Sequence, residues 1–344
     1  MKRKIGVFDL EGPLSPQDNA YELMKLIPDG GKIFEAISRY DDLLTLEGRE
    51  NYEPGDTLAL IAPYLIYNGI KEKDIKSVSD TAMLVNGAPE AITWLRSSDW
   101  EVYINSTSYR PHALNIAQRV GVEESHVHCT RFALDELGQR FSPTLLSFVG
   151  RTQARMLREL YPIEGKDKEI KEMLDEFFWE ILPESGLEPL NEVRVNGGNR
   201  KVEALHAICQ ENKVGLGDIV VVGDSITDMV MLGAVRNEGG TAVAFNANEY
   251  ALNEGNVALA TTDFRDLLPL CIKHSEGGLT EVHRFVSSQE NRTMRPQKEG
   301  GAWWEPDSNR GNYNLIAGVE DLSPIIEVHR RVRGIVREEA AKLG

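Results

Sequence analysis

Two acidic side chains near the start of the chain, Asp9 and Glu11, carry the clearest chemical signal in the sequence. They follow a short apolar run that predicts a buried strand, and residues i and i+2 of a strand point to the same face. Gly12 and Pro13 predict a sharp turn at the strand's carboxyl end, where open parallel α/β sheets bind ligands. An aspartate there can attack phosphorus or bind a divalent cation, and a neighbouring acid can move the proton of a leaving group. On these residues alone, an ordinary strand end with two solvated acids fits equally well.

Polar residues after the later strands fit the same chemistry. Ser106 and Thr107 follow a strand-like run, and their hydroxyl and backbone N–H groups suit a phosphoryl oxygen. Lys201 begins a helix after a glycine-rich turn and is a fixed cation for a phosphate or for a nucleophilic carboxylate. Asp224 and Asp228 follow the most strand-like run of the chain, and their i, i+4 spacing places them on one helix face. Carboxylates, hydroxyls and water form a hard oxygen shell, which favours Mg²⁺ over zinc.

The elements that position these residues alternate between strands and helices, which predicts an α/β protein with a doubly wound parallel sheet. Helical periodicity interrupts the pattern twice, and the composition changes again near the end of the chain. We predict, in order, core 1–14, a helical module 15–85, core 86–141, a helical hairpin insert 142–189, core 190–273, and a C-terminal extension 274–344 with a closing helix over 323–343. Within these segments we also expect a helix over 32–40, a strand over 127–134 and a turn at 135–138.

Composition excludes several classes of function. The chain has 344 residues, a formal net charge of −16 and a sequence pI near 5.0, which disfavours nucleic acid as the main partner. Its three cysteines (Cys129, Cys209 and Cys271) are too few and too far apart for a disulfide framework, so we expect a reduced, intracellular protein. No apolar stretch approaches the roughly 20 residues of a membrane span. We therefore predict a cytoplasmic protein with neither a nucleic-acid nor a membrane partner.

Taken together, these motifs resemble the haloacid dehalogenase (HAD) superfamily of phosphatases from Lys4 to about Leu270. Residues 9–14, 103–106, 201 and 223–228 match its four motifs in order. Residues 243–247 look like the strand after the fourth motif in the phosphoserine phosphatase-like branch. Any one motif is weak evidence, but four in order on strand ends form a specific pattern. The resemblance implies a HAD-type Rossmann-like core with a helical cap at 15–85, which gates the site and selects the substrate.

The resemblance also implies roles for the acids. Asp9 would be the nucleophile and a Mg²⁺ ligand, and Glu11 would be the general acid/base, with its backbone carbonyl on the metal. Asp224 would bind Mg²⁺, and Asp228 would contact the residues that bind the metal or reach the metal through water.

The remaining roles concern the phosphoryl group. Ser106 would hold it, with Thr107 beside it, and Lys201 would orient and neutralise the phosphate and the nucleophile. The implied activity is Mg²⁺-dependent hydrolysis of a small phosphorylated metabolite through an aspartyl-phosphate intermediate.

One departure from the family pattern keeps alternatives open. HAD phosphatases usually carry a second aspartate at the position of Glu11, and the extra methylene moves the acid by roughly 1 Å, a displacement that can cost about 10²-fold in rate. One alternative is a phosphotransferase or a dehalogenase that uses Asp9, although a halide leaving group needs no acid. The other is a catalytically quiet HAD-like subunit that forms an oligomer or binds a partner through the hairpin insert or the tail, which contains Trp303-Trp304.

Two further groups of residues stay outside the predicted site. The first group contains metal-ligand types, but the sequence offers no second cluster that would complete a metal site with them. The second group contains arginines that could contact an anionic substrate, and a role as solvated surface arginines fits them equally well. These residues are His126, His128 and Cys129, and Arg39, Arg49 and Arg110.

Overall fold

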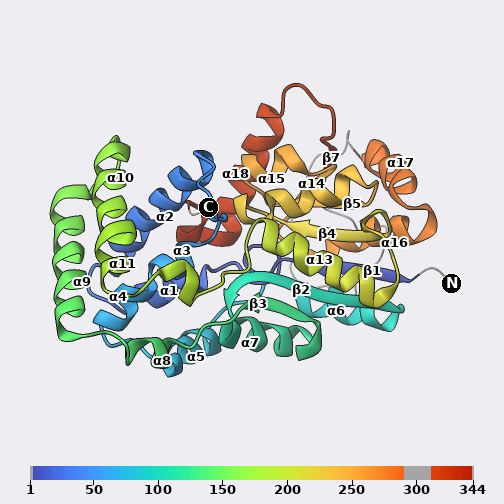
Figure 1. Ribbon diagram of the computed structural model, residues 1–344. Helices are drawn as coiled ribbons and strands as arrows, with labels where there is room; N and C mark the ends of the chain where they lie inside the picture. Colours follow the sequence, from blue (N-terminus) through green and yellow to red (C-terminus); the bar gives the residue numbers. More distant parts are fainter. Residues whose placement is uncertain (1–2, 290–310, 343–344) are drawn as a thin grey trace.

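A seven-stranded sheet forms the centre of the core in the computed structural model, which describes residues 3–289 and 311–342 (Figure 1). The strand order is β3-β2-β1-β4-β5-β6-β7, and every neighbouring pair is parallel except β6 and β7. β1 lies between β2 and β4, where the winding of the chain reverses. This confirms the predicted α/β class with a doubly wound parallel sheet. The strands are β1 (Lys4–Phe8), β2 (Trp100–Tyr109), β3 (Val127–Thr130), β4 (Ile219–Gly223), β5 (Thr241–Phe245), β6 (Val257–Ala260) and β7 (Asn312–Leu315).

Helices cover both faces of this sheet because alternate strand residues point to opposite sides. Phe8 and Val222 face one apolar layer, whereas Val7 and Val221 face the other. The first layer contains α6 (Ala88–Ser97), α7 (Arg110–Val120), η6 (Phe264–Leu267), α16 (Leu268–Gly277) and α17 (Leu279–Gln289). The second contains α13 (Asn199–Asn212), α14 (Met229–Asn237), α15 (Glu249–Glu254) and α18 (Ser323–Arg337). Short turns η1 (Glu124–His126), η4 (Leu216–Asp218) and η5 (Ile226–Asp228) lie beside the strands.

The cap and the hairpin insert share one hydrophobic core. Figure 1 shows the hairpin helices α9 and α10 beside the cap, and α2 contacts α10 while α4 contacts α9. The two predicted helical segments therefore form a single body on one side of the sheet. Its elements are α1 (Asn19–Met24), α2 (Gly30–Leu46), α3 (Thr57–Leu60), α4 (Ala62–Tyr67), α5 (Glu72–Asp80), α8 (Leu134–Gly138), α9 (Pro143–Arg155), η2 (Met156–Leu160), α10 (Asp167–Glu176), η3 (Phe177–Ile181), α11 (Leu182–Glu184) and α12 (Pro189–Glu192).

Two local predictions are wrong in their extent. The helix expected over 32–40 is the longer α2, which continues because Leu44 is also buried in the shared core. The strand expected over 127–134 ends at Thr130, and the turn expected at 135–138 lies within helix α8. Leu134 and Leu137 are buried against the helical body, so tertiary packing favours a helical turn there.

The C-terminal extension returns to the core. β7 adds an antiparallel edge strand beside β6, and neither strand was predicted from the sequence. The predicted closing helix consists of α18 followed by η8 (Glu338–Lys342). Trp303-Trp304 lies outside the described residues, so the prediction of a docking role stays a prediction.

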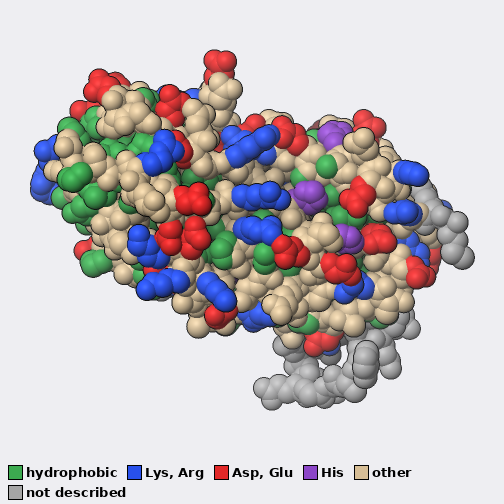
Figure 2. All heavy atoms as spheres, turned by 60° about the horizontal axis from the view of Figure 1, so that its bottom comes forward, with side chains coloured by type: hydrophobic (Ala, Val, Ile, Leu, Met, Phe, Trp, Pro, Cys, Tyr) green, Lys and Arg blue, Asp and Glu red, His purple; other side chains and the backbone are tan. Residues whose placement is uncertain are grey.

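Two general features bear on possible partners. The face seen in Figure 2 carries both acidic and basic side chains. Within residues 3–289 and 311–342, no helix combines the length and the apolar character that a membrane crossing requires.

Candidate active site

Asp9 and Asp224 lie side by side because they follow the neighbouring parallel strands β1 and β4. The backbone N–H of Asp9 still donates to the Val222 carbonyl at 2.8 Å, so its side chain leaves from the very end of the ladder. Asp228 comes from η5, one turn beyond β4, as its spacing predicted. One carboxylate oxygen from each of the three acids lies within 4.8 Å of the others, and all three residues are buried. The topology thus assembles the acidic cluster that the sequence predicted.

Lys201 on α13 connects two of these acids. Its fully buried Nζ lies 3.0 Å from Asp9 Oδ1 and 2.7 Å from Asp228 Oδ1. Burial alone would lower the pKa of Lys201, but the carboxylates of Asp228 and Asp9 outweigh burial and raise it above its ordinary value. The second oxygen of Asp228 accepts the backbone N–H groups of Asp224 at 2.9 Å and Ser225 at 3.3 Å. Asp228 therefore holds both the lysine and the loop that carries Asp224.

The neighbours of Asp9 compensate its burial only in part. Burial and the neighbouring Asp228 raise its pKa well above the ordinary value, and Lys201 lowers that pKa only in part. Asp9 Oδ1 also accepts the N–H of Leu10 at 2.7 Å. The contacts to Lys201 and Leu10 both fall on Oδ1, which favours Oδ2 as the oxygen that faces a ligand.

Glu11 lies beside this cluster and is held by two donors. Its Oε1 accepts the Ser108 hydroxyl at 2.6 Å and the N–H of Asn19 at 3.0 Å. Burial, followed by the charge of Asp18, raises the pKa of Glu11 to about 8. His112 Nε2 lies 4.0 Å from Glu11 Oε1, but burial lowers the pKa of His112 to about 3, so this imidazole is neutral. Glu11 thus keeps its proton near neutral pH, as a general acid must.

Ser106 and Thr107 occupy different places in the irregular end of β2. The Ser106 side chain is buried, and its Oγ accepts the N–H of Ser108 at 3.1 Å. Thr107 lines a pocket, and its buried Oγ1 has no hydrogen-bond partner among the described residues. A buried hydroxyl without a partner is costly. Thr107 therefore offers a binding group to whatever enters the pocket.

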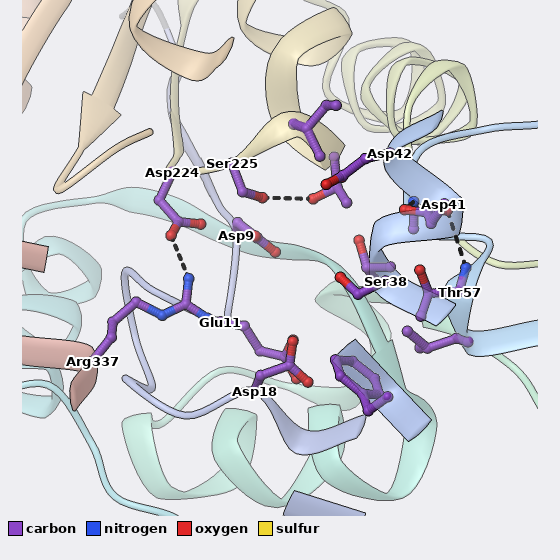
Figure 3. A pocket seen from close by; sticks show the side chains of 16 residues that line it. Asp9, Glu11, Asp18, Ser38, Asp41, Asp42, Thr57, Asp224, Ser225 and Arg337 are labelled. Atoms are coloured by element: carbon purple, nitrogen blue, oxygen red, sulfur yellow. Dashed lines mark hydrogen bonds and ion pairs between the residues drawn. The ribbon is translucent and has the colours of Figure 1, made fainter. Parts of the chain in front are cut away.

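The pocket lies between the core and the cap and has a volume of about 70 Å³. Figure 3 shows Asp9 and Asp224 on the core side, with Ser38 and Asp41 of α2 and Thr57 of α3 opposite them. Burial raises the pKa of Asp41 to about 7, with Tyr52 and backbone N–H groups as its hydrogen-bond donors. The acids that line the pocket are Asp9, Glu11, Asp18, Asp41, Asp42 and Asp224.

Arg337 of α18 is the single lysine or arginine that lines this pocket within the part of the chain that the structure describes. Its Nη1 lies 2.7 Å from Asp224 Oδ2, and Figure 3 shows the side chain reaching that carboxylate. Arg333, one turn earlier, also pairs with Asp224 Oδ2. The sequence interpretation missed both arginines. The repeat His329, Arg333, Arg337 at intervals of four residues was the available signal, since it places three polar side chains on one helix face.

The acids present fit a Mg²⁺ ion. They offer carboxylate oxygens, the ligands that Mg²⁺ prefers. Asp224 Oδ1 is buried and has no hydrogen-bond partner among residues 3–289 and 311–342, so one oxygen of this acid faces the pocket without a donor. Asp9 and Asp224 are therefore the residues that would hold the ion, while both oxygens of Asp228 are already engaged. A role for the Glu11 carbonyl stays a prediction.

The side chains that were left outside the site lie elsewhere. His126 stacks on Tyr103 with 4.2 Å between the ring centroids, and the acid triad is the one metal-competent group found in the described ranges. Arg39 pairs with Asp167 at 2.6 Å, and Arg110 pairs with Glu124. The Arg49 guanidinium lies over the ring of Trp179 at 4.0 Å. These arginines belong to other contacts and do not line the pocket.

Comparisons with known proteins identify the fold. No protein-family model and no curated protein matches the sequence. Among solved structures, the chain is similar to a gene product of Archaeoglobus fulgidus at 26% identity, with 99% of each chain covered and a TM-score of 0.83. It is also similar to a substrate-bound phosphoserine phosphatase at 16% identity, with 78% of this chain and 98% of that chain covered and a TM-score of 0.51. The chain has the fold of the phosphoserine phosphatases.

A second phosphoserine phosphatase structure, a phospho-aspartyl intermediate analogue, is similar in fold at 17% identity, with the same coverage and a TM-score of 0.50. These neighbours confirm the fold class that the motifs predicted. At such identities the likeness to the phosphatases concerns the fold, so the chemistry of this protein rests on its own residues.

Proposed function

We propose that this protein is a Mg²⁺-dependent HAD-type phosphatase that hydrolyses a small phosphomonoester through an aspartyl-phosphate on Asp9. The observation that carries the proposal is the setting of Asp9 at the carboxyl end of β1. Asp9 is paired with Lys201 at 3.0 Å and lies beside Asp224. Glu11, whose pKa is raised, follows two residues later. The fold, shared with phosphoserine phosphatases, supports it. The substrate we propose is a small phosphorylated metabolite, and the location we propose is the cytoplasm.

The mechanism uses the residues in two steps. Asp9 Oδ2 attacks phosphorus, the bond from phosphorus to the leaving oxygen breaks, and Glu11 gives that oxygen its proton. Glu11 then takes a proton from water, whose oxygen attacks phosphorus and frees both inorganic phosphate and the Asp9 carboxylate. Lys201 keeps Oδ1 in place, and the Thr107 hydroxyl donates to a phosphoryl oxygen. A bound Mg²⁺ would add positive charge against the phosphoryl oxygens.

Phosphate release tests the proposal directly. We would assay a panel of small phosphomonoesters with and without Mg²⁺, using wild type, Asp9→Asn and Glu11→Asp. Asp9→Asn is expected to lower turnover by roughly 10³-fold or more, because an amide is a poor nucleophile. Asp29→Asn is the matched control, because Asp29 is an exposed aspartate of the cap. Reduction of an aspartyl-phosphate with borohydride, followed by mass spectrometry, would locate the intermediate at residue 9.

The outcomes separate the candidate activities. Full turnover in Asp9→Asn would exclude the aspartyl-phosphate route. Turnover that appears only in Glu11→Asp would indicate a competent scaffold that is natively quiet. Transfer of the phosphoryl group to an added alcohol, rather than to water, would favour the phosphotransferase.

A second candidate, a catalytically quiet HAD-like subunit, has one observation in its favour. The carboxylate that would hold Mg²⁺ is already paired with two arginines of α18. Co-purification of a stoichiometric partner together with absence of Mg²⁺-stimulated turnover would favour this candidate. A partner would then bind through the helical hairpin or the C-terminal extension.

A further inference from the structure

α18 presents a polar face to the core. His329, Arg333 and Arg337 are buried at intervals of four residues, so they share one side of the helix. His329 Nδ1 accepts the N–H of Ala247 at 2.9 Å. Leu322 before the helix and Ile325 within it pack against the apolar layer on α18's side of the sheet. α18 is thus docked by apolar contacts at its start and by charged contacts toward its end.

Both arginines converge on one oxygen. Arg337 Nη1 lies 2.7 Å from Asp224 Oδ2, and its Nε donates to the Pro16 carbonyl at 3.1 Å. Arg333 Nη1 donates to the same Oδ2 and lies 3.3 Å from the carbonyl oxygens of Asp224 and Asn246. The two guanidinium groups therefore connect the loop after β4 with the segment that leads into the cap.

Acidic and basic side chains are equal in number in this cluster. The acids are Asp9, Asp224 and Asp228. The basic side chains in contact with them are Lys201, Arg333 and Arg337. Counted as three carboxylates, the acids would exceed Lys201 alone by two negative charges, which is the charge that a divalent cation neutralises. α18 brings two guanidinium groups to the same carboxylate, Asp224.

The two arginines of α18 repel each other, so their position depends on a nearby negative charge. Arg333 and Arg337 are both buried and both contact Asp224 Oδ2, so their two positive guanidinium groups lie next to each other. The positive pair depends on the negative charge of Asp224. A divalent cation on Asp224 Oδ1 would share that carboxylate with the arginines and repel both of them.

We infer that α18 and a divalent cation compete for Asp224, so that the C-terminal helix holds the cation site closed until a metal ion displaces Arg333 and Arg337. The inference rests on the proposed function for the identity of the ion, Mg²⁺. It assigns the C-terminal extension to regulation of the same site. The opposite possibility is that the arginines orient Asp224 for the metal. In that case removing the arginines would weaken metal binding instead of strengthening it.

Binding of Mn²⁺ to the full-length chain tests the inference, with the signal of free Mn²⁺ followed by electron paramagnetic resonance. The double variant Arg333→Gln/Arg337→Gln is expected to bind Mn²⁺ at least tenfold more tightly than wild type. Arg330→Gln is the matched control, because Arg330 is exposed on the same helix, and it should stay within twofold of wild type. Adding Asp224→Asn to the double variant should abolish the gain. Unchanged or weaker Mn²⁺ binding in the double variant would overturn the inference.

A second measurement needs no variant and covers the case in which the double variant does not fold. Hydrogen exchange of the amides of residues 329–337 in wild type should become faster when Mg²⁺ is added. Unchanged or slower exchange would refute competition. Phosphate release from the same preparations separates the two proposals: tighter Mn²⁺ binding without any turnover would remove the phosphatase but keep the competition. Turnover in wild type without tighter Mn²⁺ binding in the double variant would keep the phosphatase and remove the competition.

Discussion

Replacing Lys201 with methionine tests whether the acidic cluster depends on one buried cation. Methionine keeps most of the length of the side chain and removes its charge. The side chains of Lys201 and Asp228 are fully buried, and that of Asp9 is 5% exposed, so water cannot replace the lost partner. With an effective dielectric constant of about 20, charges at 3.0 and 2.7 Å attract each other by roughly 6 kcal/mol each before desolvation is counted.

The net effect is smaller, because burying the ammonium group itself is costly. Breaking a buried ion pair by removing one partner typically costs about 3–5 kcal/mol. We therefore expect the free energy of unfolding of Lys201→Met to be lower than that of wild type by about 3–5 kcal/mol. Urea denaturation followed by circular dichroism would measure it.

Two controls make this prediction specific. Lys168→Met removes a lysine from an exposed i, i+4 pair with Glu172 and should change the free energy of unfolding by less than about 0.5 kcal/mol. The double variant Lys201→Met/Asp228→Asn should lose less free energy of unfolding than the sum of the losses in the two single variants. The reason is that Asp228→Asn then removes an acid that has already lost its cation. A loss below about 1 kcal/mol in Lys201→Met would refute the view that Lys201 neutralises this cluster.

Two further predictions concern α18 and the pocket. Burial, and then Arg333, lower the pKa of His329 to about 3. Below about pH 6.5 His329 therefore binds a proton in the unfolded chain but not in the folded protein, which favours unfolding. The free energy of unfolding of wild type, relative to that of His329→Gln, should fall by about 2 kcal/mol between pH 7 and pH 5. Urea titrations at the two pH values would measure it, and a constant difference would contradict a neutral His329. Thr107→Val should leave the free energy of unfolding equal or raise it by up to about 1 kcal/mol, since Thr107 Oγ1 is buried without a partner, while kcat/KM for phosphate release should fall about tenfold. Unchanged kinetics would show that the Thr107 hydroxyl does not bind the phosphoryl group.

Much of the fold and part of the site could be predicted because their signals are local. A β-strand that ends in an acid can be recognised within ten residues, and this is how Asp9 and Asp224 were found at neighbouring strand ends. The i, i+4 spacing of Asp224 and Asp228 likewise predicted their shared face. Short strands such as β6 and β7 were missed, since β6 has four residues and β7 is an edge strand whose pairing comes from distant residues.

The amino-acid sequence alone predicts the alternation of strands and helices, the acids at the strand ends and the position of Lys201. That the cap and the hairpin insert form one body, and that α18 reaches the acidic cluster, follows from the three-dimensional packing. The physical reason is the range of the interactions. Periodicity records which side of an element is buried, but not what buries it, and Arg337 meets Asp224 across 113 residues of chain.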